Sequence, residues 1–117
     1  MRLDDTDVID FLGFEKSSND IVVTILDDHD WTNEQRHLQL LQAKVNRCFD
    51  FIESGEIYDA LRRSTGTEPV RAAAKKISII AKHYPSPDGL GLLKEASRVA
   101  TELGLSLEHS VREEDRT

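Results

Sequence analysis

The longest amphipathic pattern in the chain occupies residues 33–54. Apolar side chains recur there at steps of three and four, the spacing of a helix with one buried face: Leu38, Leu41, Val45, Cys48, Phe49 and Ile52. Thr32 and Gln35 have the spacing of a capping box, and Gly55 stands where a helix C-cap favours glycine. The pattern predicts a helix over residues 33–54.

A second helical pattern follows Ser86 and Pro87, which form a typical N-cap and first-turn pair. Gly104 follows its last apolar residue and predicts the end of the helix. The apolar face of this helix consists of Leu92, Leu93, Ala96, Val99, Ala100 and Leu103.

Two β-branched runs precede the first helix, at residues 8–15 and 21–26, and the polar residues 16–20 separate them. This arrangement predicts a β-hairpin. The second run is apolar on both faces, which favours a central strand over an edge strand.

Two further strands are predicted later in the chain, from Lys76 to Tyr84 and over residues 105–111. The segment 57–61 is ambiguous and is read as a possible short strand. The polar residues 112–117 are expected to form a frayed tail.

The predicted order of elements is therefore ββα(β)βαβ within one domain, residues 1–117. Each of the two amphipathic helices must bury its apolar face, and the predicted strands supply a sheet for this. The pattern therefore favours an α+β two-layer sandwich. We expect a mostly antiparallel sheet of four to five strands with both helices on one face. If residues 57–61 form a strand, a ferredoxin-like variant becomes possible.

The composition is that of a folded globular chain: 117 residues, 38% hydrophobic and 32% charged. No apolar run has the length of a membrane span, and no signal-peptide pattern opens the chain. The single cysteine, Cys48, has no disulfide partner within the chain. These features predict a cytoplasmic protein that does not insert into membranes.

The net charge of −7 arises entirely within residues 1–30, called the acidic segment below, which hold nine Asp or Glu against two basic residues. The rest of the chain carries equal numbers of acidic and basic side chains. This asymmetry argues against nucleic acid and favours a basic protein partner. We expect Asp27, Asp28 and Asp30 to contact that partner, with Trp31 as an anchor if its ring is exposed.

The same stretch allows a metal site as an alternative, because carboxylates and imidazoles bind divalent cations. Its candidate ligands are Asp27, Asp28, His29, Asp30 and His37. The spacing is not that of a calcium-binding loop. A solvated loop in which Trp31 fills a gap in the core explains the same residues.

Other reactive side chains have ordinary structural explanations. Cys48 lies on the apolar stripe of the first helix, where burial makes a thiol inert. His83 and His109 lie in phase with apolar strand neighbours and form a proton-transfer pair only if their strands adjoin. A basic stretch could pair with the acidic segment: Arg62, Arg63, Arg71, Lys75, Lys76 and Lys82. No motif indicates a cofactor.

Several short segments resemble a family of short bacterial proteins of unassigned function. They are Asp7-Val8-Ile9-Asp10, Asp30-Trp31, His37 to Asn46, Phe51 to Glu56, and Tyr84-Pro85 with Gly89-Leu90. The resemblance spans nearly the whole chain. It implies a bacterial intracellular protein and assigns no catalytic residues.

These observations favour a non-enzymatic binding module. Its size and acidity are typical of immunity proteins, which neutralise a toxin by covering its cationic active site. One alternative is a small metal- or ligand-binding enzyme centred on residues 27–37. Another is a homodimer joined through a sheet edge and lacking a ligand; the sequence leaves monomer and homodimer open.

Overall fold

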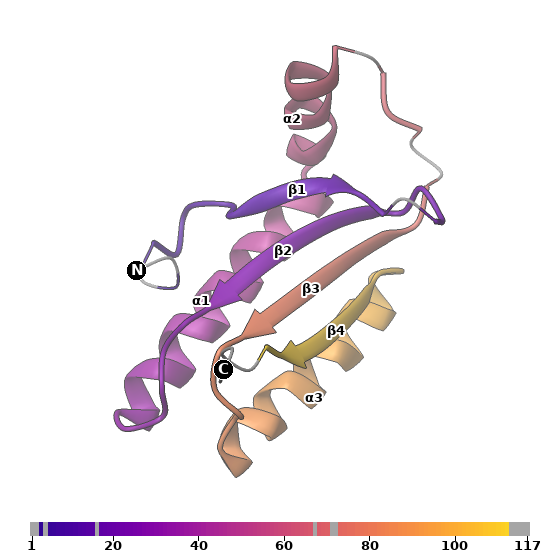
Figure 1. Ribbon diagram of the computed structural model, residues 1–117. Coiled ribbons are helices and arrows are strands. Elements are labelled where there is room, and N and C mark those ends of the chain that lie inside the picture. The colour runs from indigo at the N-terminus through magenta and orange to yellow at the C-terminus, as the bar shows by residue number, and fades with distance from the viewer. Residues whose placement is uncertain (1–2, 4, 16, 67, 71–72, 113–117) are drawn as a thin grey trace.

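The computed structural model describes residues 3, 5–15, 17–66, 68–70 and 73–112 as a single sheet with helices beside it (Figure 1). The elements follow one another as β1 (Phe11–Phe14), β2 (Ile21–Asp27), α1 (Glu34–Glu53), α2 (Glu56–Thr65), β3 (Lys75–Ala81), α3 (Pro87–Glu102) and β4 (Ser106–Val111). The expected α+β class is confirmed. The described part of the chain contains no helix long and apolar enough to cross a membrane.

The sheet is mixed, and the expectation of a mostly antiparallel sheet is wrong. Its strand order is β1-β2-β3-β4, with β1 antiparallel to β2 and the other neighbours parallel. Helices connect β2 to β3 and β3 to β4, and such a crossover returns the chain in the same direction. The predicted hairpin and the central position of β2 are confirmed.

Residues 57–61 lie in helix α2, so the possible strand and the ferredoxin-like variant are wrong. Ile57, Tyr58 and Leu61 are buried together on one side of this helix. Acidic residues in its first turn and arginines in its last turn match the helix dipole. The short apolar run is therefore one face of a helix bounded by glycines.

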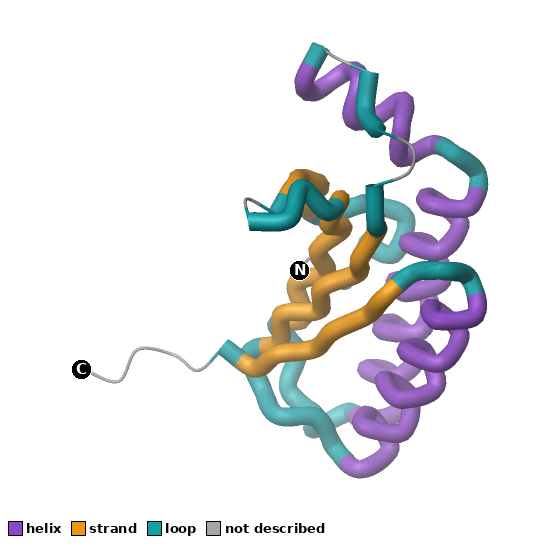
Figure 2. Tube along the Cα trace, turned by 90° about the vertical axis from the view of Figure 1, so that its right-hand side faces the viewer, coloured by secondary structure: helices purple, strands orange, loops and turns teal. Residues whose placement is uncertain are grey.

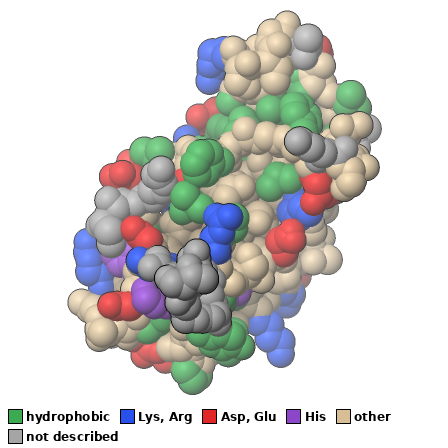
Figure 3. Space-filling view, viewed as in Figure 1, with side chains coloured by type: hydrophobic (Ala, Val, Ile, Leu, Met, Phe, Trp, Pro, Cys, Tyr) green, Lys and Arg blue, Asp and Glu red, His purple; other side chains and the backbone are tan. Residues whose placement is uncertain are grey.

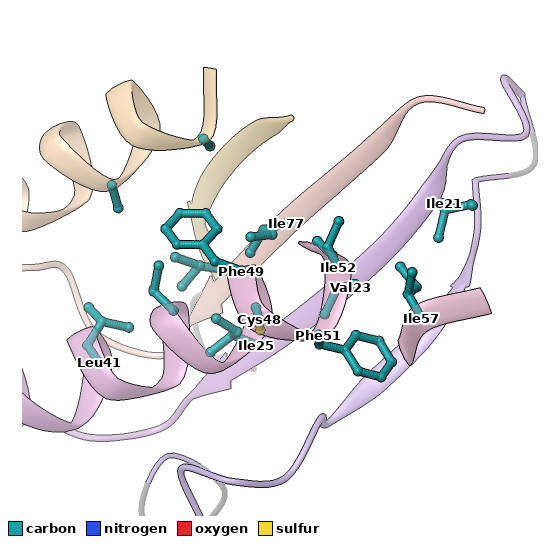
Figure 4. Packing of buried hydrophobic residues seen from close by; sticks show 14 of the residues in the cluster. Ile21, Val23, Ile25, Leu41, Cys48, Phe49, Phe51, Ile52, Ile57 and Ile77 are labelled. Carbon is teal, nitrogen blue, oxygen red and sulfur yellow. The ribbon is translucent and has the colours of Figure 1, made fainter. Parts of the chain in front are cut away.

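Two layers make up the fold, with α1 and α3 against one face of the sheet (Figure 2). The core fills the space between these layers (Figure 4). It includes Ile21, Val23 and Ile25 of β2, Ile77 and Ile79 of β3, Leu41, Val45, Cys48 and Ile52 of α1, and Leu93, Ala96 and Ala100 of α3. Alternate strand residues are fully buried because they face the helices.

Several element ends differ from the predicted ones for local reasons. β1 begins at Phe11 instead of Val8: before Phe11 the Leu26 amide of β2 donates to the Asp10 side chain, and the Val8 carbonyl accepts from Lys44. The N-cap of α1 is Asn33, whose side chain accepts from the Arg36 amide, and not Thr32. The Thr32 hydroxyl donates to Asp30 instead. β3 ends at Ala81, before the predicted Tyr84.

The second long helix agrees with its predicted start. The Ser86 hydroxyl accepts from the Gly89 amide, and Pro87 occupies the first turn of α3. Strand β4 also matches the predicted segment 105–111 closely. Residues 113–117 of the expected tail lie outside the described part of the chain.

Gly89 allows Trp31 to pack on the first turn of α3. A Cβ added at Gly89 would lie 2.7 Å from Cη2 and 2.9 Å from Cζ2 of the Trp31 ring. At Gly91, two residues further along the same helix, an added Cβ meets nothing within 4 Å. The two glycines are thus a matched pair for testing this contact.

We predict that Gly89→Ala destabilises the protein by about 1–3 kcal/mol, because overpacking outweighs the better helix propensity of alanine. Gly91→Ala should stabilise it by about 0.5–1 kcal/mol. Urea denaturation measures both. Equal effects of the two substitutions would contradict the Trp31–α3 contact.

Candidate functional site

Most of the candidate functional side chains lie near the carboxyl ends of the parallel strands. We call them the carboxyl-edge cluster: Asp27, Asp28, His29, Asp30, Trp31, His37, His83 and His109. It contains every histidine of the chain. Asp27 ends β2, His83 follows β3, and His109 belongs to β4. In open α/β sheets this edge is the usual place for ligands.

Asp27 and His37 form a buried pair at the centre of the cluster. Asp27 is 4% exposed and His37 is 1% exposed. His37 Nε2 lies 2.8 Å from Asp27 Oδ1 and 2.7 Å from Oδ2, and its Nδ1 lies 2.8 Å from the Asp30 carbonyl oxygen. A carbonyl and a carboxylate both accept, so both ring nitrogens donate. The geometry therefore matches an imidazolium paired with a carboxylate.

The Trp31 side chain lies in the interior of this cluster. Its ring stacks on His37 with centroids 3.6 Å apart and an interplanar angle of 17°. It is partly buried and packs against the hydrophobic core. With Gly89 on another side, this ring is held between α1 and α3, so Trp31 is not available as an exposed anchor.

Asp28 and Asp30 are exposed, in contrast to Asp27. The Asp30 carboxylate accepts from both the hydroxyl and the amide of Thr32, and these bonds hold its pKa below the usual value. Asp27 Oδ1 also accepts from the His29 amide. Of the three aspartates expected to meet a partner, only Asp28 and Asp30 can do so through their side chains.

The two remaining histidines have different surroundings. His109 is half-buried, and desolvation lowers its pKa, an effect that the Asp27 charge partly offsets. His83 is exposed in the loop after β3. Although β3 and β4 adjoin, His83 does not lie in a strand, so strand pairing does not place it against His109.

The metal alternative receives no support from this arrangement. The described residues contain no group of three or more His, Cys, Asp or Glu side chains placed to hold a metal ion. His37 cannot offer a ring nitrogen, because both nitrogens donate to oxygen atoms. Asp27 is likewise occupied by His37.

The acidic segment is partly neutralised by basic residues from other parts of the chain. Lys44 of α1 is 1% exposed and donates to the Asp5 carbonyl, the Val8 carbonyl and the Asp10 carboxylate. The Asp10 carboxylate also accepts from the Leu26 amide. Lys44 thus ties residues 5–10 to α1.

Sequence reasoning missed Lys44, although a signal was present. The residue lies three positions after Leu41 and four before Cys48, within the apolar stripe of α1. A lysine at such a position is either buried with a partner or extends to solvent. The excess of aspartates in the acidic segment favours a buried lysine that is paired with a carboxylate.

On the sheet surface, Lys76 pairs with Glu15 and with Glu108. The Ser18 hydroxyl and then Lys76 lower the pKa of Glu15, while Glu108 and then Glu15 raise that of Lys76. The basic stretch therefore meets the acidic segment at Lys76. Arg62 pairs instead with Asp59 and Glu68, and Arg71 lies outside the described residues.

Cys48 is buried in the core, and desolvation raises the pKa of its thiol to about 12. At neutral pH almost no thiolate is present. The expectation that Cys48 lies on the buried face of the first helix is confirmed.

The other face of the sheet, called the open face below, is not covered by α1, α2 or α3 (Figures 1 and 2). It is hollowed by a depression of about 330 Å³ that runs across all four strands and includes Phe11, Gly13, Val22, Thr24, Ser78 and Glu108. Phe11 is 51% exposed at its edge. Figure 3, which views this face, shows hydrophobic side chains gathered around β1.

Comparison with known proteins assigns no activity to this arrangement. A family model described as a family of unknown function, DUF6572, matches residues 1–113. No curated protein and no solved structure matches the chain.

We predict that Asp27→Ala destabilises the protein by about 3–5 kcal/mol, because it leaves His37 buried without its counter-charge. Asp28→Ala removes an equal charge from the exposed neighbour and should change stability by no more than about 0.5 kcal/mol. Chemical denaturation measures both variants. If Asp27→Ala were no more costly than Asp28→Ala, the buried pair would not be structural.

Proposed function

We propose that this chain, which belongs to the family of unknown function DUF6572, is a protein-binding module whose open face docks a basic partner protein. The observation that carries the proposal is the half-exposed Phe11 beside a depression on a sheet face without a helical cover. An immunity-type inhibitor that covers the cationic site of a toxin is the form of this function we favour.

Phe11 supplies the apolar anchor of the proposed interface. Aromatic side chains contribute most to binding when they lie near the centre of an interface and lose their water there. The Phe11 register with Thr24 places its side chain on the open face, beside small and hydroxyl side chains. A partner side chain can therefore fit closely against it.

Charge supplies the preference for a basic partner. Glu15 and Glu108 share Lys76, so the open face itself holds internally paired charges. Asp28 and Asp30 remain exposed at the end of the same sheet, and the net charge stays at −7. Such a field raises association rates with cationic proteins more than it raises affinity.

The test is affinity purification from the organism that carries the gene, with four bait proteins compared quantitatively. Phe11→Ala should lose the partner that the wild-type bait retains, because losing an anchor of about 2 kcal/mol weakens binding about 30-fold. Leu90→Ala is the matched control, since Leu90 is also about half exposed but lies on α3. It should retain the partner.

The fourth bait, Asp28→Asn/Asp30→Asn, tests the charge contribution and keeps an oxygen acceptor for Thr32. It should bind the same partner with a slower association and a weaker dependence on salt. The proposal fails if every protein retained by the wild-type bait is retained equally by Phe11→Ala. It also fails if the retained partner is acidic.

A further inference from the structure

Strand β4 is the terminal strand of the sheet and presents its outer edge to solvent (Figure 1). The Arg112 amide donates inward to the Ala81 carbonyl, beside β3. Because peptide groups alternate in direction along a strand, those of Leu107, His109 and Val111 point outward. No hydrogen bond from these outward groups to another described residue is present.

This edge lacks the usual protection against pairing. Natural proteins blunt exposed edges with short strands, lysine, proline or bulges. The opposite edge strand, β1, has only four residues. β4 has six, with neither lysine nor proline, and pairs with β3 in regular register throughout. Its charged Glu108 is held toward β3 by Lys76.

We propose that the outer edge of β4 binds β4 of a second copy of this chain, in antiparallel register, to form one continuous eight-stranded sheet. In this register His109 lies opposite His109 of the second copy, and Leu107 lies opposite Val111. Although Glu108 borders both surfaces, the outer edge of β4 lies at the opposite side of the sheet from Phe11, so the inference goes beyond the proposed function and does not depend on it.

Three features select this register. Opposed residues must share a sheet face, and Leu107, His109 and Val111 all lie on the helix side through their pairing with β3. Centring the pairs on His109 places each of these outward residues in a hydrogen-bonded pair. It also sets the half-buried Leu107 and Val111 against each other, extending the apolar layer between the copies.

Charge favours the same register over its neighbour. A shift that centred the pairs on Glu108 would place two carboxylates directly opposite each other. In the proposed register Glu108 lies opposite Ser110 and diagonal to the exposed Arg112 of the second copy. Diagonal neighbours about 7–8 Å apart are within reach of long side chains.

The first experiment measures molecular mass by light scattering over a range of concentrations. The wild type should reach twice the 13.2 kDa of one chain. Arg112→Glu should weaken the dimer about tenfold, because it places like charges across the interface. Arg36→Glu changes the net charge equally at an exposed position of α1 and should have no effect. Adding Glu108→Gln to Arg112→Glu should restore part of the affinity.

The second experiment tests the register by disulfide formation under mild oxidation. His109→Cys should form a cross-linked dimer readily, because hydrogen-bonded antiparallel pairs have Cα atoms about 5.5 Å apart. Ser110→Cys is the control, since its two copies would be diagonal and too far apart. The native Cys48 is buried and does not interfere.

A dimer that responds to Arg112→Glu, ignores Arg36→Glu and cross-links through position 109 supports the proposal. A wild type that stays monomeric at all concentrations overturns it. So does a dimer that Arg112→Glu leaves intact, since another surface would then join the copies. Phe11→Ala should not alter the dimer, so failure of the proposed docking function would be seen separately.

Discussion

The buried ammonium group of Lys44 is the interaction on which the amino-terminal part of the structure depends. It reaches two backbone carbonyls and the Asp10 carboxylate, whose side chain is only 2% exposed. Asp10 in turn accepts from the Leu26 amide in β2. One cation thus links the chain before β1 to α1 and to the sheet. The Asp27–His37 pair repeats this arrangement one residue further along β2, so two buried ion pairs connect the acidic segment to the same helix.

This internal neutralisation changes what the acidic segment means for function. Part of the negative charge of this segment is used to assemble the fold, since Asp10, Glu15 and Asp27 all have cationic partners within the chain. Our proposals therefore rest on two other surfaces of the described residues: the open face beside Phe11 and the outer edge of β4. A singly wound βαβ arrangement leaves both exposed, because its helices cover only one face.

Sequence patterns predicted the elements with long apolar periodicity, namely α1, α3, the hairpin and β4. They missed α2 because five residues of apolar pattern fit a strand and a helix face equally well, and only tertiary packing decides between them. They also missed the parallel pairing of β2 with β3 and of β3 with β4, although the helical connections between these strands indicate it. At the site, the sequence pattern identified the polar residues around Asp27, but it did not show that Asp27 and His37 are buried. Spacing along a chain cannot show that His37 turns both nitrogens toward acceptors or that Trp31 lies flat on its ring.

The central claim, that Lys44 and Asp10 hold the acidic segment in place, is tested most directly by a double-mutant cycle measured by urea denaturation. Lys44→Met alone should cost about 3–5 kcal/mol, because the Asp10 carboxylate is left buried without a counter-charge. The double variant Asp10→Asn/Lys44→Met should cost clearly less than the sum of the two single changes. Strictly additive costs would contradict the account, because they would show that the two groups do not stabilise each other.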